Sequence, residues 1–259
     1  MNNGKKILDL ILFLTVFILL QEPSAAVMKL QIDPNAIITK NFLGFGCHGD
    51  CFLNCKVNTF RGVAEKDRKA VFDMVRLMRP QVVRTFFAYQ WWEPYEGIQT
   101  PDSEYIKDYV DYVRLLKSID CKVNLTPWGD WFAYSSWMRP DPNSRMPVEN
   151  KKERMIRSLV DFAQYLRNNQ GLTNVSYITL MNEPDNSSRK PDVNEFIRLN
   201  RMLADELIKR GMRKDIFIVG VDGSSWSMAE KGDWFYDVLK AGGTDYFDGA
   251  ACHTYGQNL

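Results

Sequence analysis

Short apolar segments alternate with longer amphipathic segments along most of this chain. Six of the short segments are rich in Val, Ile, Phe or Leu and lack the regular polar alternation of a strand with one face in water. This pattern predicts parallel strands that are buried on both faces. The six segments are Phe42–Cys47, Val82–Phe87, Lys122–Pro127, Val175–Met181, Ile216–Val221 and Phe247–His253.

Apolar residues recur at helical spacing in the segments between these strands, which predicts amphipathic helices. The stripe within Phe196–Leu207 follows Pro191-Asp192, a helix start signal, and ends before Gly211, a stop signal. Further stripes lie within 70–78, 106–113, 155–166 and 234–239. We expect all of these stripes to face the core.

The repeating strand–helix unit of about 40 residues has nearly the length used by a (β/α)8 barrel. A doubly wound open sheet also fits the alternation, but the segment Gly44–Gly49 lacks the glycine spacing of a dinucleotide-binding turn. Six of the eight strand–helix units are found before Leu259. We therefore predict an α/β fold, a (β/α)8 TIM barrel that is C-terminally incomplete, with residues 27–259 as one partial catalytic barrel.

The N-terminal segment has the features of a signal peptide. Lys5 and Lys6 precede the apolar run Leu10–Leu20, and Ser24-Ala25-Ala26 supplies the small residues that a signal peptidase requires. We predict that residues 1–26 are removed, that the protein is secreted or periplasmic, and that it has no stable membrane insertion after cleavage. An uncleaved N-terminal anchor is the alternative.

Charge and composition limit the classes of partner. The chain has 33 basic and 32 acidic side chains and a formal net charge of +1, which gives no electrostatic attraction for nucleic acid or an anionic membrane. Hydrophobic residues make up 45% of the chain and aromatic residues 13%, enough for a folded core. We expect a partner that is neutral or modest in charge.

The cysteines raise the question of a metal site. Cys47, Cys51 and Cys55 are spaced by fours and lie near His48, which could indicate zinc. In an exported protein, however, neighbouring cysteines are more often oxidised. The chain has only two histidines, which also argues against a metal-dependent hydrolase. We predict no metal and no cofactor.

Polar and aromatic side chains follow the predicted strands, at the end where functional groups gather in parallel α/β folds. Sugars fit such a mixture, because their apolar faces stack on indole rings and their hydroxyls need amides, carboxylates or arginine. Core packing is the alternative explanation for any single tryptophan. We predict a carbohydrate substrate contacted by Trp92, Trp128, Trp131, Trp137, Asn124 and Trp226, with Trp128, Trp131 and Trp137 as the main stacking residues.

Glu183 is the strongest candidate for a catalytic residue. It lies in the triplet Asn182-Glu183-Pro184 at the end of the fourth predicted strand. Glycoside hydrolysis needs a carboxyl group that stays protonated to donate to the leaving oxygen, and aromatic or acidic neighbours would raise its pKa. Asn182 is placed to hydrogen-bond the sugar 2-hydroxyl.

With these residues the chain resembles the retaining glycoside hydrolases of clan A, which include family-five cellulases and mannanases and the family-thirty and family-thirty-nine enzymes. The resemblance runs from Phe42 to Tyr255 and rests on Arg84, Trp92-Glu93-Pro94-Tyr95-Glu96-Gly97, Asn182-Glu183 and His253-x-Tyr255. It implies hydrolysis of O-glycosidic bonds of a poly- or oligosaccharide by retaining double displacement, with Glu183 as acid/base and Asn182 as the 2-hydroxyl contact. It also implies that Arg84, His253 and Tyr255 orient the nucleophile and the sugar.

The resemblance further implies a second glutamate, the nucleophile, on a seventh strand beyond Leu259. Glu93, Glu96, Asp130 and Asp222 are other acids of the predicted rim, but none matches that position. Retention requires two carboxyl groups about 5–5.5 Å apart. We therefore expect this polypeptide alone to have little or no hydrolase activity. The alternative function is a non-catalytic carbohydrate-binding protein on a degenerate barrel.

Overall fold

The structure, a computed structural model, describes residues 44–50, 53–54, 58, 60, 62–128, 134–139, 141, 146–185, 191–224 and 234–253. All of them belong to one compact unit, Leu43–Leu259. The signal peptide expected at residues 1–26 lies outside the described residues and stays a prediction. None of the helices in the described ranges combines the length and the apolar character needed to cross a bilayer.

Six parallel strands form one sheet in the described part of the chain, and their order in the sheet is their order in the sequence. They are β1 (Gly46–His48), β2 (Val82–Phe87), β3 (Lys122–Pro127), β4 (Val175–Thr179), β5 (Phe217–Gly223) and β6 (Gly249–Cys252). The predictions for β2 and β3 are confirmed residue for residue, and those for β4, β5 and β6 differ only at their ends. Of the described residues in the first predicted strand, Phe42–Cys47, only Gly46 and Cys47 belong to β1. The sequential order excludes a doubly wound sheet, in which the strand order reverses part-way.

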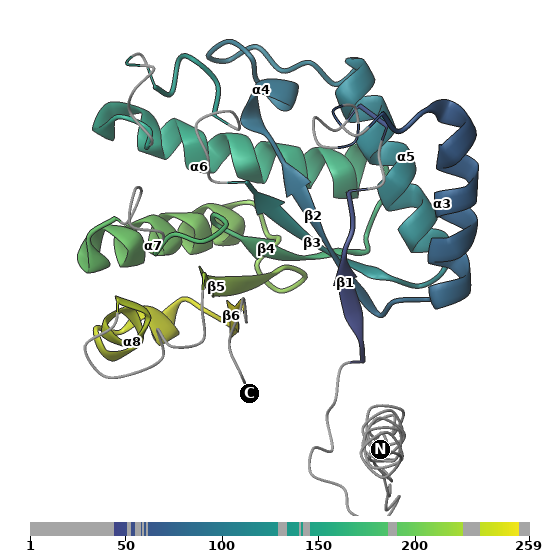
Figure 1. The fold of residues 1–259 in the computed structure, drawn as a ribbon. Coiled ribbons are helices and arrows are strands. Elements are labelled where there is room, and N and C mark those ends of the chain that lie inside the picture. Colours follow the sequence, from purple (N-terminus) through teal and green to yellow (C-terminus); the bar gives the residue numbers. More distant parts are fainter. Residues whose placement is uncertain are drawn as a thin grey trace, which may run out of the picture. The chain divides into compact units, whose positions relative to one another are not determined.

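Helices connect the strands and form an arc around the sheet (Figure 1). The α-helices are α3 (Glu65–Met78), α4 (Tyr89–Trp92), α5 (Glu104–Ser118), α6 (Glu149–Gln164), α7 (Val193–Lys209) and α8 (Trp234–Lys240). A π-helical turn, η1 (Tyr165–Asn169), extends α6, and a 3-10 turn, η3 (Gly243–Asp245), follows α8. Asp192 caps α7, as its sequence indicated, because its carboxylate accepts the backbone N–H groups of Asn194 and Glu195.

The sheet is strongly curled. Arg84 on β2 lies 3.2 Å from His253, which directly follows β6 (Nη1 to Nε2). In a flat sheet these strands, four places apart, would be separated by about 19 Å, since neighbours lie roughly 4.8 Å apart. The side chains therefore meet across a concave inner face. The described chain forms an incomplete (β/α)8 barrel, as predicted.

Aromatic rings fill the layer between the outer face of the sheet and the helices. Phe87 of β2 stacks on Phe162 of α6 at 4.4 Å, and Tyr109 of α5 meets the same ring at 5.4 Å. All three rings are fully buried. Each contributes roughly 1.5–3 kcal/mol from burial, which makes this cluster the main link between β2, α5 and α6.

Two expectations about burial were wrong at the edge of the barrel. β1 and β6 are largely exposed rather than buried on both faces, because each has a single neighbour in the sheet. Met74 and Met78 on α3 were expected to face the core but are 56% and 61% exposed. α3 follows the edge strand β1, so the sheet covers less of its surface than it covers on α6 or α7.

The described cysteines, Cys47, Cys121 and Cys252, are free thiols. Cys51 and Cys55 lie outside the described residues, so the expected oxidation of this group of cysteines stays a prediction. Burial raises the pKa of the Cys121 thiol to about 12, so this thiol stays protonated and unreactive. Within the described ranges, no three His, Cys, Asp or Glu side chains are grouped so as to hold a metal ion.

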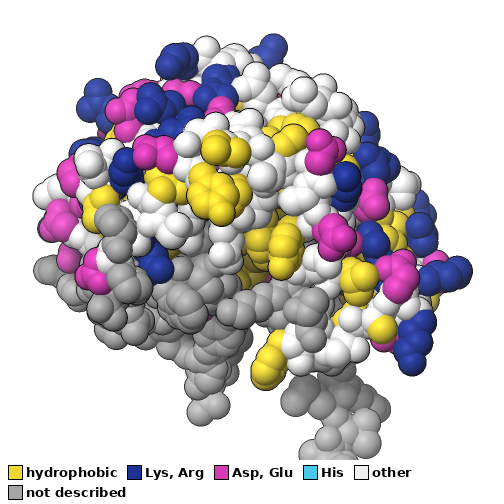
Figure 2. All heavy atoms as spheres, turned by 90° about the horizontal axis from the view of Figure 1, so that it is seen from above, with side chains coloured by type: hydrophobic (Ala, Val, Ile, Leu, Met, Phe, Trp, Pro, Cys, Tyr) yellow, Lys and Arg dark blue, Asp and Glu magenta, His cyan; other side chains and the backbone are white. Residues whose placement is uncertain are grey.

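Acidic and basic side chains are interspersed among the described residues on the face shown in Figure 2, with hydrophobic side chains between them. Many of the charges on the outer helices form ion pairs within a helix, such as Lys69–Asp73 on α3 and Arg157–Glu153 on α6. Positive and negative side chains are therefore mixed locally on this face, as they are nearly balanced over the whole chain.

The prediction that Glu93 is one of the acids of the rim was wrong. Its side chain is fully buried, and Arg154 of α6 binds both carboxylate oxygens at 2.8 Å. The backbone N–H of Gly97 donates to the same carboxylate. Arg154 continues to Asp161, which binds Arg210 at the end of α7. The network joins the loop after β2 to two helices and leaves Glu93 no access to a substrate.

We predict that Arg154→Met lowers the free energy of unfolding by about 3–5 kcal/mol, because it leaves the Glu93 carboxylate buried without its cation. Arg157→Met, the same change on the same helix, should cost at most about 1 kcal/mol, since the Arg157–Glu153 pair is exposed. Urea unfolding followed by circular dichroism measures both. Equal effects of the two substitutions would contradict the structural role assigned to Glu93.

Candidate active site

A β-bulge in β5 turns Asp222 toward the inner face. The register with β6 runs from Gly220↔Ala250 to Asp222↔Ala251, so Val221 is an extra residue. Gly220 faces outward, because a Cβ there would lie 2.1 Å from the ring of Phe247. Regular alternation would therefore point Asp222 outward as well, and the bulge reverses it. The cost is a β-branched residue, Val221, at φ +32°.

The backbone after β4 is held from both sides. The N–H of Asn182 donates to the carbonyl of Pro127 on β3 (3.1 Å), and that of Glu183 donates to the carbonyl of Asp222 on β5 (3.0 Å). Glu183 has a left-handed backbone, φ +44°. Such a conformation is uncommon outside glycine and occurs where a side chain must be aimed. In this conformation the side chain of Glu183 reaches His253, which follows β6, two strands away.

Five side chains from β2 and from the ends of β4, β5 and β6 form one cluster, the Arg84 cluster: Arg84, Asn182, Glu183, Asp222 and His253. Arg84 donates to the Asn182 side-chain oxygen and forms an ion pair with Asp222 (Nη2 to Oδ2, 2.8 Å). His253 bonds Glu183 through Nδ1 at 2.7 Å and Asp222 through Nε2 at 3.1 Å. The side chain of Asp222 is 4% exposed, whereas that of Glu183 is 17% exposed. Glu183 is thus the carboxylate of the cluster that is open to a ligand.

The cluster favours a protonated imidazole. The hydrogen bond to Asp222 is the largest influence raising the pKa of His253, and the bond to Glu183 also raises it, against burial and the positive charge of Arg84. Burial raises the pKa of the neighbouring Asp185, and the negative charge of Glu183 adds to this effect. Asp185 accepts the backbone N–H of Ser224 at 2.9 Å, which ties the loop after β4 to the end of β5.

An aromatic surface borders the cluster. The guanidinium of Arg84 lies 4.6 Å from the centre of the Phe86 ring, and Phe86 meets Trp128 edge-on at 4.0 Å and His48 at 4.3 Å. His48 is in turn bonded to Asp50 at 2.7 Å. Trp128, predicted to stack on a sugar, therefore lies beside Phe86, the ring over which the Arg84 guanidinium is placed.

Two other predicted contacts are engaged in protein bonds. The side-chain amide of Asn124 donates to Thr179 at 3.0 Å on the inner face. The indole N–H of Trp137 donates to the carbonyl of Glu93 at 3.0 Å. Trp92 is a correction: it is 2% exposed and packs against Phe162 and Tyr165, so it belongs to the core and not to the mouth.

The remaining predicted site residues, Tyr255, Trp131 and Trp226, lie outside the described residues, as does Asp130. Sequence reasoning noted Asp222 only as one more rim acid and did not connect it with His253 or Arg84. Its position at the end of an apolar run was visible, but the bulge that turns it inward was not. The His48–Asp50 pair was also missed, although His48 ends the first strand.

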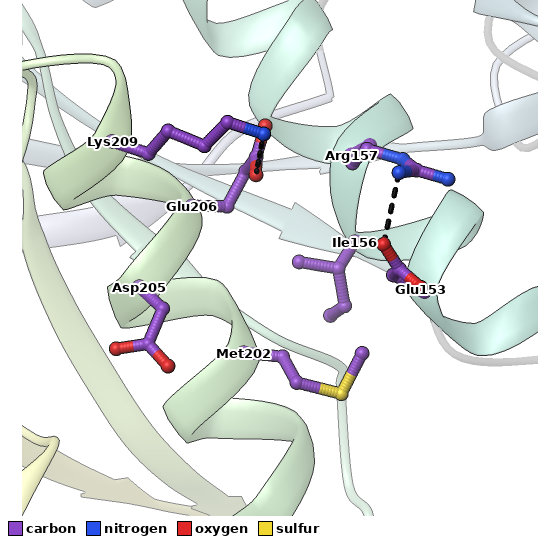
Figure 3. A pocket seen from close by; sticks show the side chains of 7 residues that line it. All are labelled: Glu153, Ile156, Arg157, Met202, Asp205, Glu206 and Lys209. Carbon is purple, nitrogen blue, oxygen red and sulfur yellow. Dashed lines mark hydrogen bonds and ion pairs between the residues drawn. The ribbon is translucent and has the colours of Figure 1, made fainter.

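A surface groove lies elsewhere, between α6 and α7. It is lined by Glu153, Ile156, Arg157, Met202, Asp205, Glu206 and Lys209. Figure 3 shows the ion pairs Arg157–Glu153 and Lys209–Glu206 at its sides. None of these residues belongs to the Arg84 cluster, and both helices lie in the outer layer. The groove is therefore not the candidate active site.

Comparison with known proteins gives neighbours by structure alone. No protein-family model and no curated protein sequence matches the chain. A family 39 glycoside hydrolase from Bacteroides cellulosilyticus WH2 is similar with a TM-score of 0.56 and 20% identity, over 82% of this chain and 38% of its own. A family 30 endoxylanase from Clostridium papyrosolvens C71 is similar with a TM-score of 0.55 and 13% identity, over 83% of this chain and 50% of its own. An exo-β-1,4-mannosidase from Opitutaceae bacterium strain TAV5 is similar with a TM-score of 0.53 and 14% identity, over 69% of this chain and 31% of its own.

The chain has the barrel fold of these glycoside hydrolases. The resemblance to clan A is therefore confirmed at the level of the fold. The chain spans half or less of the length of each of these three structures. At such low identity the likeness concerns the fold, and the activity has to be argued from the Arg84 cluster.

The raised pKa of His253 predicts a pH-dependent contribution to stability. A group whose pKa is higher in the folded state stabilises it fully below its unfolded pKa of about 6.5 and loses this effect as the pH rises through the folded pKa. The difference in unfolding free energy between the wild type and His253→Gln should thus be largest near pH 6 and shrink toward pH 9. Urea unfolding at several pH values measures it. A difference that grows with pH would contradict the charge state assigned to His253.

Proposed function

We propose that this protein is a glycoside hydrolase that cleaves O-glycosidic bonds of a poly- or oligosaccharide, with Glu183 as the acid/base. The observation that carries the proposal is the 2.7 Å bond between Glu183 and His253 at the end of β4, beside Arg84 and Asn182. It combines a carboxyl group open to a ligand with a source of protons and two groups able to bind sugar hydroxyls.

The chemistry follows from these roles. Glu183 donates a proton to the oxygen of the leaving group as the bond to the anomeric carbon breaks. Arg84 occupies the side-chain oxygen of Asn182, which leaves the amide NH2 group to donate to a sugar hydroxyl. Trp128 and Phe86 supply apolar surface for the face of a ring.

We further propose a retaining double displacement, for which a second carboxylate is required about 5–5.5 Å from Glu183. Asp222 is a poor nucleophile because it is buried and paired with Arg84, and Asp185 is bonded to Ser224. The described residues of the cluster thus contribute the acid/base and no free second carboxylate. Binding of carbohydrate without hydrolysis is the second candidate function, and this observation is the one that favours it.

The proposed setting is extracellular or periplasmic, after removal of the predicted signal peptide at residues 1–26. The proposed partner is a neutral carbohydrate, with no metal, cofactor or nucleic acid. The formal net charge of +1 supports a neutral partner over a polyanion.

The proposal is tested with 4-nitrophenyl and 2,4-dinitrophenyl glycosides, with and without azide. Azide can attack the anomeric carbon in place of the second carboxylate, while the phenol leaves with a proton from Glu183. We expect glycosyl azide of inverted configuration and little turnover without azide. Glu183→Gln should slow the 4-nitrophenyl substrate roughly 10²–10⁴-fold and the dinitrophenyl substrate much less, because a better leaving group needs no proton.

Each other outcome is decisive. Turnover without azide that Glu183→Gln abolishes would support the hydrolase but refute the absence of a second carboxylate. Oligosaccharide binding, seen as quenching of tryptophan fluorescence, without any turnover would favour the binding protein. Neither binding nor turnover with any glycan would overturn both.

A further inference from the structure

The charges of the Arg84 cluster require one shared proton. With a neutral imidazole, Arg84, Glu183 and Asp222 sum to one negative charge, and protonation of His253 makes the cluster neutral. Three charged groups of the described residues contact His253: Arg84 of β2, Glu183 after β4 and Asp222 of β5. Cys252 precedes it on β6, where burial and Asp222 raise the pKa of its thiol, so it stays uncharged.

The two ring nitrogens of His253 have different partners. Nδ1 meets Glu183 at 2.7 Å. Nε2 has two competing neighbours: Asp222 at 3.1 Å, whose carboxylate can only accept a hydrogen bond, and Arg84 at 3.2 Å, whose guanidinium can only donate one. Because a nitrogen either carries hydrogen or accepts it, only one of these contacts is a hydrogen bond at a time. The partner of Nε2 thus determines which nitrogen is free to exchange a proton with Glu183.

We propose that Asp222 is a positioning residue that keeps hydrogen on Nε2 of His253, so that Nδ1 passes its proton to Glu183. In this step the N–H bond at Nδ1 breaks, its electron pair stays on the nitrogen, and an O–H bond forms at Oε1 of Glu183. The imidazolium becomes neutral imidazole and the carboxylate becomes the carboxylic acid. No other reagent takes part. The catalytic use of that acid rests on the proposed function, whereas the tautomer of His253 does not.

The local fold explains why Asp222 is suited to this role. Its ion pair with Arg84 and its burial hold its side chain in one place, whereas the side chain of Glu183 is more exposed. The bulge that turns Asp222 inward places Val221 in a strained backbone conformation, and such strain is typical of functional sites. Without Asp222, Arg84 would donate to Nε2, the proton would settle on Nδ1, and Glu183 would remain an ionised acceptor.

The test is a ¹⁵N NMR measurement of the imidazole nitrogens, which are widely separated in chemical shift according to whether they carry hydrogen. The chain has only two histidines, so two sets of signals are expected. In Glu183→Gln, a neutral mimic of the protonated acid, the neutral His253 ring should carry hydrogen on Nε2. In Asp222→Asn it should carry hydrogen on Nδ1, and the midpoint of its titration should move to lower pH.

Controls come from the other histidine. Both variants should leave the signals of His48 unchanged, and Asp50→Asn should alter His48 but not His253, because His48 bonds Asp50 at 2.7 Å. The same tautomer in Glu183→Gln and Asp222→Asn would overturn the proposal. If Asp222→Asn does not fold, Glu183→Gln decides alone: hydrogen on Nδ1 would overturn it and hydrogen on Nε2 supports it. The expected tautomers in a protein that turns over no aryl glycoside even with azide would refute the proposed hydrolase and leave the role of Asp222 intact.

Discussion

The ion pair between Arg84 and Asp222 is the interaction on which the rest of the site depends. It joins the second strand to the fifth across the inner face, at 2.8 Å, with Asp222 almost wholly buried. A buried carboxylate without its cation costs several kcal/mol, so the curl that brings these strands together and the bulge that turns Asp222 inward are coupled to the pair. Once both charges are in place, Asn182 and His253 have fixed partners, and His253 in turn reaches Glu183.

Backbone strain at two residues accompanies this arrangement. Val221 and Glu183 both have positive φ, at a cost of order 1–3 kcal/mol each. The backbone around Glu183 is bonded to β3 and β5, and Val221 lies between residues that pair with β6, so the surrounding hydrogen bonds hold both strained conformations. The benefit is preorganisation: Glu183, the imidazole of His253 and the ion pair of Arg84 with Asp222 are already in contact before a ligand arrives.

Much of the fold was predictable because buried parallel strands and core-facing helices leave strong apolar patterns. Strands β2 and β3 follow directly from such runs, and the position of Glu183 beside the inner face was predictable because its motif follows the fourth apolar run. The errors arose where tertiary context overrides local pattern. Trp92 looked like a rim residue but fills the core, and Met74 looked like core but lies on the helix after the edge strand. The role of Asp222 could not be predicted, because one extra residue in a strand reverses its direction without any mark in the composition.

The central claim, that Arg84 and Asp222 act as one unit, is tested most directly by a double-mutant cycle. The free energies of unfolding of the wild type, Arg84→Met, Asp222→Asn and the double variant would be measured by urea denaturation at one pH. The account predicts a coupling energy of at least about 1.5 kcal/mol, as found for close, desolvated charge pairs. Effects that add to within about 0.5 kcal/mol would contradict it, since they would mean that the two side chains contribute independently.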